Sequence, residues 1–276
     1  MIVHTSRLAL PPVPDRTRRS GTALLPALAR LATVAAGLVL MWQAIVLATG
    51  APHYILPGPL GVGRALVESR ELILFHAALT LSEVMLGLAL GAACGAAAAI
   101  ALAYFRPARR WLLPVLVASQ AIPVFAVAPL LVLWLGYGMA SKVAMAALII
   151  FFPVTTAFFD GLRRTDPAWL DTALTLGAGR ATLLWRVRVP AALPGFASGL
   201  RIAVAVAPIG AVVGEWVGSS AGLGFLMLHA NARVQIELMF AALLVLMAIG
   251  VALYLAADAL LRRLVFWQAD APPAED

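Results

Sequence analysis

The sequence predicts an all-α, polytopic membrane protein with six transmembrane helices. Of its 276 residues, 63% are hydrophobic and only 12% are charged, whereas soluble domains average about 45–50% apolar and about 25% charged residues. Apolar runs recur along the chain, most of them close to the roughly 20 residues that a helix needs to cross a bilayer. The net charge is +7, and the basic residues lie between these runs, which favours membrane topology over nucleic-acid binding. We therefore expect membrane lipid, and no nucleic acid, as a partner.

The N-terminal part is predicted to hold a tail, one span and an interfacial helix. Residues 1–23 combine arginines and prolines with no sustained apolar pattern, which is typical of a disordered tail. Residues 24–75 are expected to hold the first span, at about 26–49, and then a helix lying at the outer interface. That helix follows proline and glycine turns. It carries four charged residues: Arg64, Glu68, Arg70 and Glu71.

Residues 76–264 are predicted to form the core transmembrane domain, followed by a tail at 265–276. The expected spans are 77–105, 112–135, 143–159, one centred on 202–214, and 238–261. The third of the six spans contains three prolines: Pro114, Pro123 and Pro129. Such prolines are tolerated where neighbouring helices or a polar cavity satisfy the backbone. The fifth span is uncharged only over 202–214, so it must carry charge close to the membrane, and Pro208 favours a bend in it.

Charged residues in or near the spans should face protein, a polar cavity or the interface, because lipid does not solvate them. These residues are Glu83, Arg201, Glu215 and Asp258. One interpretation places a translocation pathway along Gln120, Pro208, Glu215 and Trp216. The alternative is that these side chains lie near an interface and pair or pack locally. The residues alone leave both open.

The basic residues predict the orientation of the chain in the membrane. Six spans place both termini on one side. Four basic residues then fall on the opposite side: Arg64, Arg70, Lys142 and Arg233. The other 16 of the 20 lysines and arginines lie on the side of the termini, so the positive-inside rule predicts cytoplasmic termini and a cytoplasmic 160–190 segment.

The segment 166–190, DPAWLDTALTLGAGRATLLWRVRVP, is predicted to form two short helices between the fourth and fifth spans. Asp166 can cap the first helix, Pro167 suits its first position, and Gly177 supplies the left-handed residue that ends it. The face of this helix suits a shallow groove on another protein. A second helix is expected at about 180–187, before Pro190 begins the next span.

Catalytic and nucleotide-binding patterns are absent from the sequence. A phosphate-binding loop needs GxxxxGK[ST], yet the only lysine, Lys142, stands between Ser141 and Val143. The four histidines are scattered and Cys94 is the only cysteine, so neither a metal cluster nor an internal disulfide is predicted. We expect a chain that is not an enzyme and holds no cofactor.

The spacing within 166–190 resembles a cytoplasmic loop in permease subunits of bacterial ATP-binding-cassette (ABC) importers, written EAA-x3-G-x9-I-x-L-P. Here Asp171-Thr172-Ala173 is followed by three residues, Gly177, nine residues and Val187-Arg188-Val189-Pro190. The resemblance extends over 54–266 and is nearest to the nitrate, sulfonate and taurine branch. Within it, 207–244 is similar to permeases for thiamine pyrimidine precursors.

The resemblance implies a type I importer permease fold in the bacterial inner membrane, working as a homodimer. It also implies separate ATPase subunits that bind ATP, which dock on the helices of 166–190, and an external solute-binding protein. The residues implied at the ATPase interface are Trp169, Asp171, Thr172, Ala173, Gly177, Gly179, Val187 and Pro190.

Two other classes stay open at this point. One is a secondary transporter driven by an ion gradient, with Glu215 or Glu83 carrying the proton. The other is a membrane scaffold that binds a partner but has no solute path. The solute also stays open between a pyrimidine precursor, a sulfonate, taurine and nitrate.

Overall fold

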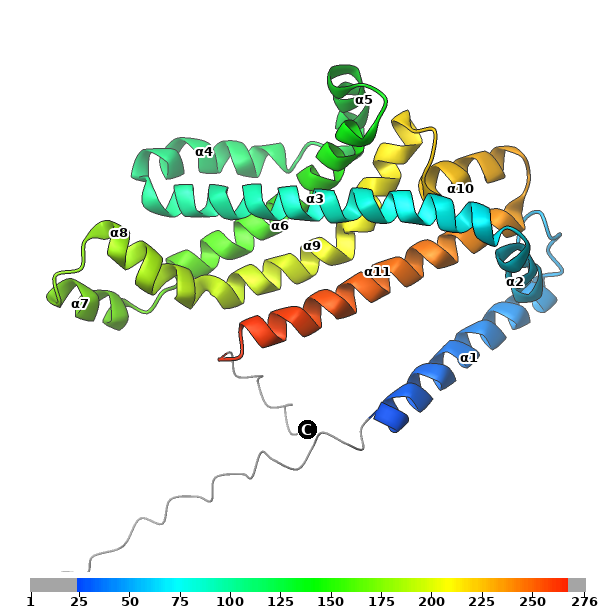
Figure 1. Cartoon of the computed structure of the whole chain (residues 1–276), viewed down its shortest axis with the longest axis horizontal. Coiled ribbons are helices and arrows are strands. Elements are labelled where there is room, and N and C mark those ends of the chain that lie inside the picture. The colour runs from blue at the N-terminus through cyan, green and yellow to red at the C-terminus, as the bar shows by residue number, and fades with distance from the viewer. Residues whose placement is uncertain (1–23, 268–276) are drawn as a thin grey trace, which may run out of the picture. The chain divides into compact units, whose positions relative to one another are not determined.

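The computed structural model describes residues 24–267, and every regular element within them is a helix. The chain divides into two compact units after Pro52. The first contains α1 (Leu24–Thr49). The second contains α2 (Pro59–Glu68), α3 (Arg70–Tyr104), α4 (Arg106–Ser119), α5 (Val124–Leu135), α6 (Met139–Arg163), α7 (Pro167–Thr175), α8 (Arg180–Leu183), the π-helix η1 (Leu184–Arg188), α9 (Val189–Gly218), α10 (Leu223–Ala232) and α11 (Ile236–Leu264) (Figure 1).

Five stretches of helix are long and apolar enough to cross a membrane: α1, α3, α6, the continuous α8–η1–α9, and α11. A sixth span results if α4 and α5, which bend by 102° at their junction, are taken together. The third predicted span is therefore broken. Pro123 explains the position of the break, because a proline disfavours helical backbone at the residue before it and lacks the N–H that would continue the ladder.

The boundary between the interfacial helix and the second span also differs from the prediction. The helix α2 ends at Glu68, and the Ser69 N–H closes it with a bond of 2.9 Å to the Ala65 carbonyl. Arg70 and Glu71 therefore belong to the first turn of α3. At 35 residues, α3 is about 52 Å long, well beyond the roughly 30 Å of the hydrocarbon core, so these charged residues can lie outside the lipid.

The helix α6 lies between α3 and α9 and packs extensively against both. Glycines bring the backbones together. A Cβ on Gly91 of α3 would lie 2.7 Å from the Ala147 carbonyl oxygen, and one on Gly199 of α9 would lie 2.7 Å from the Pro153 oxygen. Small residues of this kind are how membrane helices approach closely. The central buried cluster between these helices consists of Val84, Ala146, Ile150, Val154, Ala203, Ala207 and Ala211.

The last helix, α11, runs antiparallel to α9 and is tied to it by an ion pair. Asp258 accepts from Arg201 Nε at 2.7 Å and from Arg262 Nε at 2.8 Å. Asp258 and Arg201 are thus partnered within the protein. In Figure 1, α7 and α8 lie at one end of the second unit and α10 lies at the other.

The close packing at Gly91 can be tested with the smallest possible side chain. Gly91→Ala should destabilise the protein by about 1–3 kcal/mol, because the new methyl group meets backbone that cannot move aside. Thermal unfolding in detergent measures the effect. The matched control is Gly37→Ala in α1, where a Cβ would have no atom within 4 Å. Equal melting temperatures for the two variants would contradict this account of the packing.

Candidate functional site: a docking groove and a buried polar cluster

The first short helix, α7, forms as the sequence predicts. The Asp166 carboxylate accepts from the Ala168 N–H at 2.8 Å, and Pro167 occupies the first turn. At the other end Gly177 has φ +79°, and the Ala178 N–H bonds to the Ala173 carbonyl at 3.0 Å. This is the left-handed C-terminal closure that glycine permits, so α7 has defined ends.

The second short helix is not separate from the fifth span. The helices α8, η1 and α9 are contiguous, so the chain is helical from Arg180 to Gly218. The wide π turn lies immediately before Pro190, and the Val189 N–H bonds back to the Leu184 carbonyl. A π turn removes the clash that a proline ring makes with the carbonyl four residues earlier. Pro190 is thereby accommodated within a helix rather than marking its start.

A groove of about 780 Å³ lies between α7 and the start of α9. Its walls are mostly apolar. Five of the eight residues expected at an ATPase interface line it: Trp169, Thr172, Ala173, Val187 and Pro190. The other wall residues are Leu176, Arg186, Ala191, Pro194 and Trp267. Asp171, Gly177 and Gly179 do not line the groove. The structure thus gathers most, but not all, of the predicted residues on one surface.

At the opposite end of the unit, the N-terminus of α10 is capped by side chains from other helices. The buried Glu215 carboxylate of α9 accepts from the N–H groups of Gly224 and Phe225, and Thr80 Oγ1 of α3 donates to it at 2.6 Å. The Leu223 N–H in turn bonds to Thr80 Oγ1 at 2.8 Å. Negative charge is favourable at the amide end of a helix. Glu215 therefore fixes α10 to α3 and α9.

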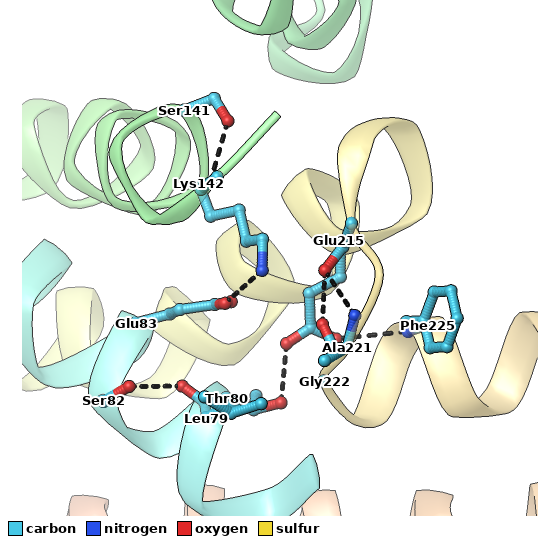
Figure 2. Close-up of polar contacts among 12 residues, drawn as sticks. Leu79, Thr80, Ser82, Glu83, Ser141, Lys142, Glu215, Ala221, Gly222 and Phe225 are labelled. Atoms are coloured by element: carbon cyan, nitrogen blue, oxygen red, sulfur yellow. Dashed lines mark hydrogen bonds and ion pairs between the residues drawn. The ribbon is translucent and has the colours of Figure 1, made fainter. Parts of the chain in front are cut away.

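A second buried charge lies beside this arrangement. Lys142 of α6 forms a 2.7 Å ion pair with Glu83 of α3, and both side chains are almost fully buried. Figure 2 shows Glu83 and Lys142 directed at each other, next to Glu215 and the turn at Gly222. The turn is bound too, since the Gly222 N–H bonds to His76 Nδ1 at 2.9 Å. We call His76, Thr80, Glu83, Lys142, Glu215 and Gly222 the buried polar cluster.

The four pathway candidates are only partly brought together. Trp216 lies beside Glu215, and its Nε1 donates to the Gly224 carbonyl at 3.1 Å. Pro208 is buried two turns earlier in α9. Gln120 lies at the junction of α4 and α5, where it lines a small cavity with Thr155 and Phe152. A pathway along these four residues stays a prediction.

The partners of the two buried glutamates are not evident from the sequence. The sequence predicts Lys142 in an outer loop, but it occupies the first turn of α6 and is buried in the protein. A lysine that is the only one in the chain and directly precedes an apolar run is a usable signal for such a partner. Thr80 and His76 carry no such signal, because their role depends on where α10 begins.

Comparison with known proteins places this geometry in a family. Residues 87–266 match the family described as the binding-protein-dependent transport system inner membrane component. A probable ABC transporter permease protein of Haemophilus influenzae is 58% identical over 83% of this chain and 94% of its own length. The formylaminopyrimidine transport permease protein ThiX of Halalkalibacterium halodurans is 37% identical, covering 84% of this chain and 92% of that protein. The riboflavin transport system permease protein RibX of Chloroflexus aurantiacus is 40% identical, covering 84% and 87%.

The fold agrees with a solved importer. A chain of the MetNI methionine ABC transporter, in an inward facing conformation, superposes with a TM-score of 0.62 at 17% identity. The match covers 71% of this chain and 97% of that one. The chain thus belongs to the binding-protein-dependent transport system inner membrane components, the permease subunits of ABC importers.

Proposed function

We propose that this permease imports a small nitrogen heterocycle of the vitamin-precursor type, with formylaminopyrimidine as the first candidate. The observation that carries the proposal is the similarity to ThiX over 84% of the chain and 92% of that protein. The relative named for riboflavin is matched over a similar length, and riboflavin too is built on a nitrogen heterocycle. The alternative candidate solutes are a sulfonate, taurine and nitrate.

ABC importer permeases are transport subunits, and their ATP is bound by a separate ATPase chain. This assignment sets aside the ion-gradient and scaffold alternatives. For this chain we further propose that the ATPase docks in the groove lined by α7 and the start of α9. The exposed Trp169 and the mostly apolar walls support this, because interfaces are anchored by aromatic side chains seated in pockets.

Charge and exposure support an orientation and an assembly for the permease. The sequence predicts 16 of the 20 basic residues on the side of the termini and of 166–190, so the positive-inside rule favours an orientation with the groove facing the cytoplasm. The opposite end, with the buried polar cluster, would then face the solute-binding protein. Large apolar side chains on and just beyond α5 are exposed, among them Leu133 at 76% and Trp134 at 69%. We assign this face to a second copy of the permease in a homodimer.

The proposed mechanism is transmission through α7 into α6 and α9. The helix α7 follows α6 after three residues and leads through Gly177 into the continuous α8–η1–α9. A capped helix seated in the ATPase can therefore push on both helices that form the centre of the permease. Closure of the ATPase pair would tilt them between inward-open and outward-open arrangements.

Docking in the groove predicts a difference between two tryptophans of equal exposure. Trp169 is 57% exposed and lines the groove, whereas Trp185 is 58% exposed and does not. Trp169→Ala should weaken ATPase binding by about 2 kcal/mol or more, as expected for an interface anchor. Trp185→Ala should leave it unchanged. Co-purification and titration of the ATPase measure both, and equal losses would argue against the groove.

Coupling predicts a specific defect in Gly177→Val. A β-branched residue is strained at φ +79°, so α7 should lose its fixed position while the chain still inserts. The amount of solute taken up per ATP hydrolysed should fall by about tenfold. Gly50→Val is the control, because Gly50 has φ +55° but lies outside 166–190. Uncoupling by both variants would show that strain alone is responsible.

Uptake into proteoliposomes tests the solute. The permease is reconstituted with its ATPase and solute-binding protein, and labelled formylaminopyrimidine, riboflavin, taurine and nitrate are compared. ATP-dependent accumulation of the pyrimidine is the expected result. Accumulation of taurine or nitrate alone would overturn the heterocycle proposal, and accumulation without the ATPase would overturn the mechanism.

A further inference from the structure

A second cavity, of about 730 Å³, lies on the other side of α7 from the docking groove. It is formed where the end of α3 and the start of α4 meet α7, α8 and η1. Its lining residues are Ala103, Tyr104, Phe105, Pro107, Arg109, Leu174, Arg180, Leu183, Leu184 and Arg188. We call it the arginine pocket. Leu174 of α7 faces it, whereas Trp169, Thr172 and Ala173 face the groove.

The charge of the arginine pocket is uncompensated. Arg109, Arg180 and Arg188 line it, and no acidic residue does. Within residues 24–267 these three guanidinium groups form no ion pair, since the ion pairs there join Lys142 to Glu83 and Arg201 and Arg262 to Asp258. Three guanidinium groups that line one pocket without a counter-charge favour an anion, and a phosphate in particular, because guanidinium matches its oxygens with paired N–H donors.

Arg188 gives a second, independent indication. Its Nε is buried and has no hydrogen-bond partner among the described residues. A buried donor without an acceptor costs free energy, so buried donors in native proteins are rarely left without a hydrogen bond. Arg188 is also the last residue of η1, and single π turns inside helices often occur at functional sites. The local geometry therefore presents an N–H group that a ligand could satisfy.

The rest of the wall is suited to an amphiphile rather than to a free anion. Leu174, Leu183 and Leu184 are apolar, and the Tyr104 and Phe105 rings pack edge to face with centroids 4.8 Å apart. Trp111 and Trp185, on the adjoining α4 and η1, are exposed. Such aromatic residues are typical of the membrane–water interface. The pocket thus combines three guanidinium groups with apolar and aromatic surface, a combination that suits an amphiphile with a phosphate headgroup.

We propose that the arginine pocket binds the phosphate of an anionic phospholipid from the cytoplasmic leaflet. Basic pockets between membrane helices on this side are suited to such headgroups. The proposal rests on the orientation given under the proposed function. A bound lipid would contact the α3–α4 corner and the α7–η1 segment together, so it would hold α7 against the helices that it moves. Lipid composition would in this way regulate coupling.

The test uses the permease assembled with its ATPase in nanodiscs of phosphatidylcholine with increasing phosphatidylglycerol. Native mass spectrometry counts the phosphatidylglycerol molecules retained by the complex. Arg109→Gln/Arg180→Gln, which changes two exposed side chains, should require about tenfold more phosphatidylglycerol for half occupancy. Arg188→Gln should act in the same direction. The control Arg263→Gln removes an exposed charge of α11 that does not line the pocket and should match the wild type.

Three results would overturn the proposal. Retention equal in the double variant and in Arg263→Gln would show that the pocket holds no lipid. Displacement of phosphatidylglycerol by millimolar inorganic phosphate would assign the pocket to a soluble anion. Loss of the ATPase from the double variant, with lipid retention unchanged, would assign the arginines to the ATPase. No solute is needed for these measurements, so their failure is distinguishable from failure of the solute assignment, which the uptake experiment tests separately.

Discussion

The close contact of α6 with α3 and α9 is the interaction on which the rest of the second unit depends. Lipid chains are as apolar as the side chains that face them, so burying those side chains against another helix gains little. Helices in a bilayer therefore associate through close backbone approach rather than through hydrophobic burial alone. Gly91 and Gly199 provide that approach on the two sides of α6. Because α7 connects α6 to the helix continuous with α9, a force applied to α7 reaches two helices that are already packed together.

The buried polar cluster supplies hydrogen-bond partners to backbone groups that would otherwise lack them. The first N–H groups of α10 have no partner within their own helix, and a bilayer core would supply none. Thr80 and Glu215 provide acceptors from α3 and α9. The buried charge of Glu83 is likewise matched by Lys142 of α6. The polar groups of this cluster therefore link α3, α6 and α9, the same three helices whose backbones are brought together by glycines elsewhere along their length.

Much of the fold could be predicted because its causes are local. Apolar run lengths located the spans, and Asp166, Pro167 and Gly177 defined α7 through capping and backbone preference. The break at Pro123 and the continuous passage through Pro190 were harder. The same residue type ends one helix and is absorbed by a π turn in the other, and the outcome depends on tertiary packing.

The candidate site also has a part that a local motif predicts and a part that depends on the tertiary fold. The 171–190 motif predicts a shared surface, and four of its residues, Thr172, Ala173, Val187 and Pro190, line one groove. The pairing of Glu83 with Lys142 joins residues 59 positions apart, and that of Thr80 with Glu215 joins residues 135 positions apart. Neither pairing leaves a periodic pattern in the sequence. The arginine pocket is likewise not predictable from the sequence, because its three arginines come from two separate segments that meet only in the folded chain.

Helical continuity from Arg180 to Gly218 has a geometric consequence. Within this stretch, the 30 residues of α9 form a helix about 45 Å long, with one end beside the docking groove and the other carrying Glu215. For a helix of that length, each degree of tilt about one end displaces the other by about 0.8 Å. A tilt of about five degrees at the groove end would therefore move the Glu215 end by about 4 Å, which is more than the reach of a hydrogen bond. Under the proposed docking of the ATPase, a small angular change at the groove end would thus rearrange the polar contacts around Glu215 at the other end of the helix.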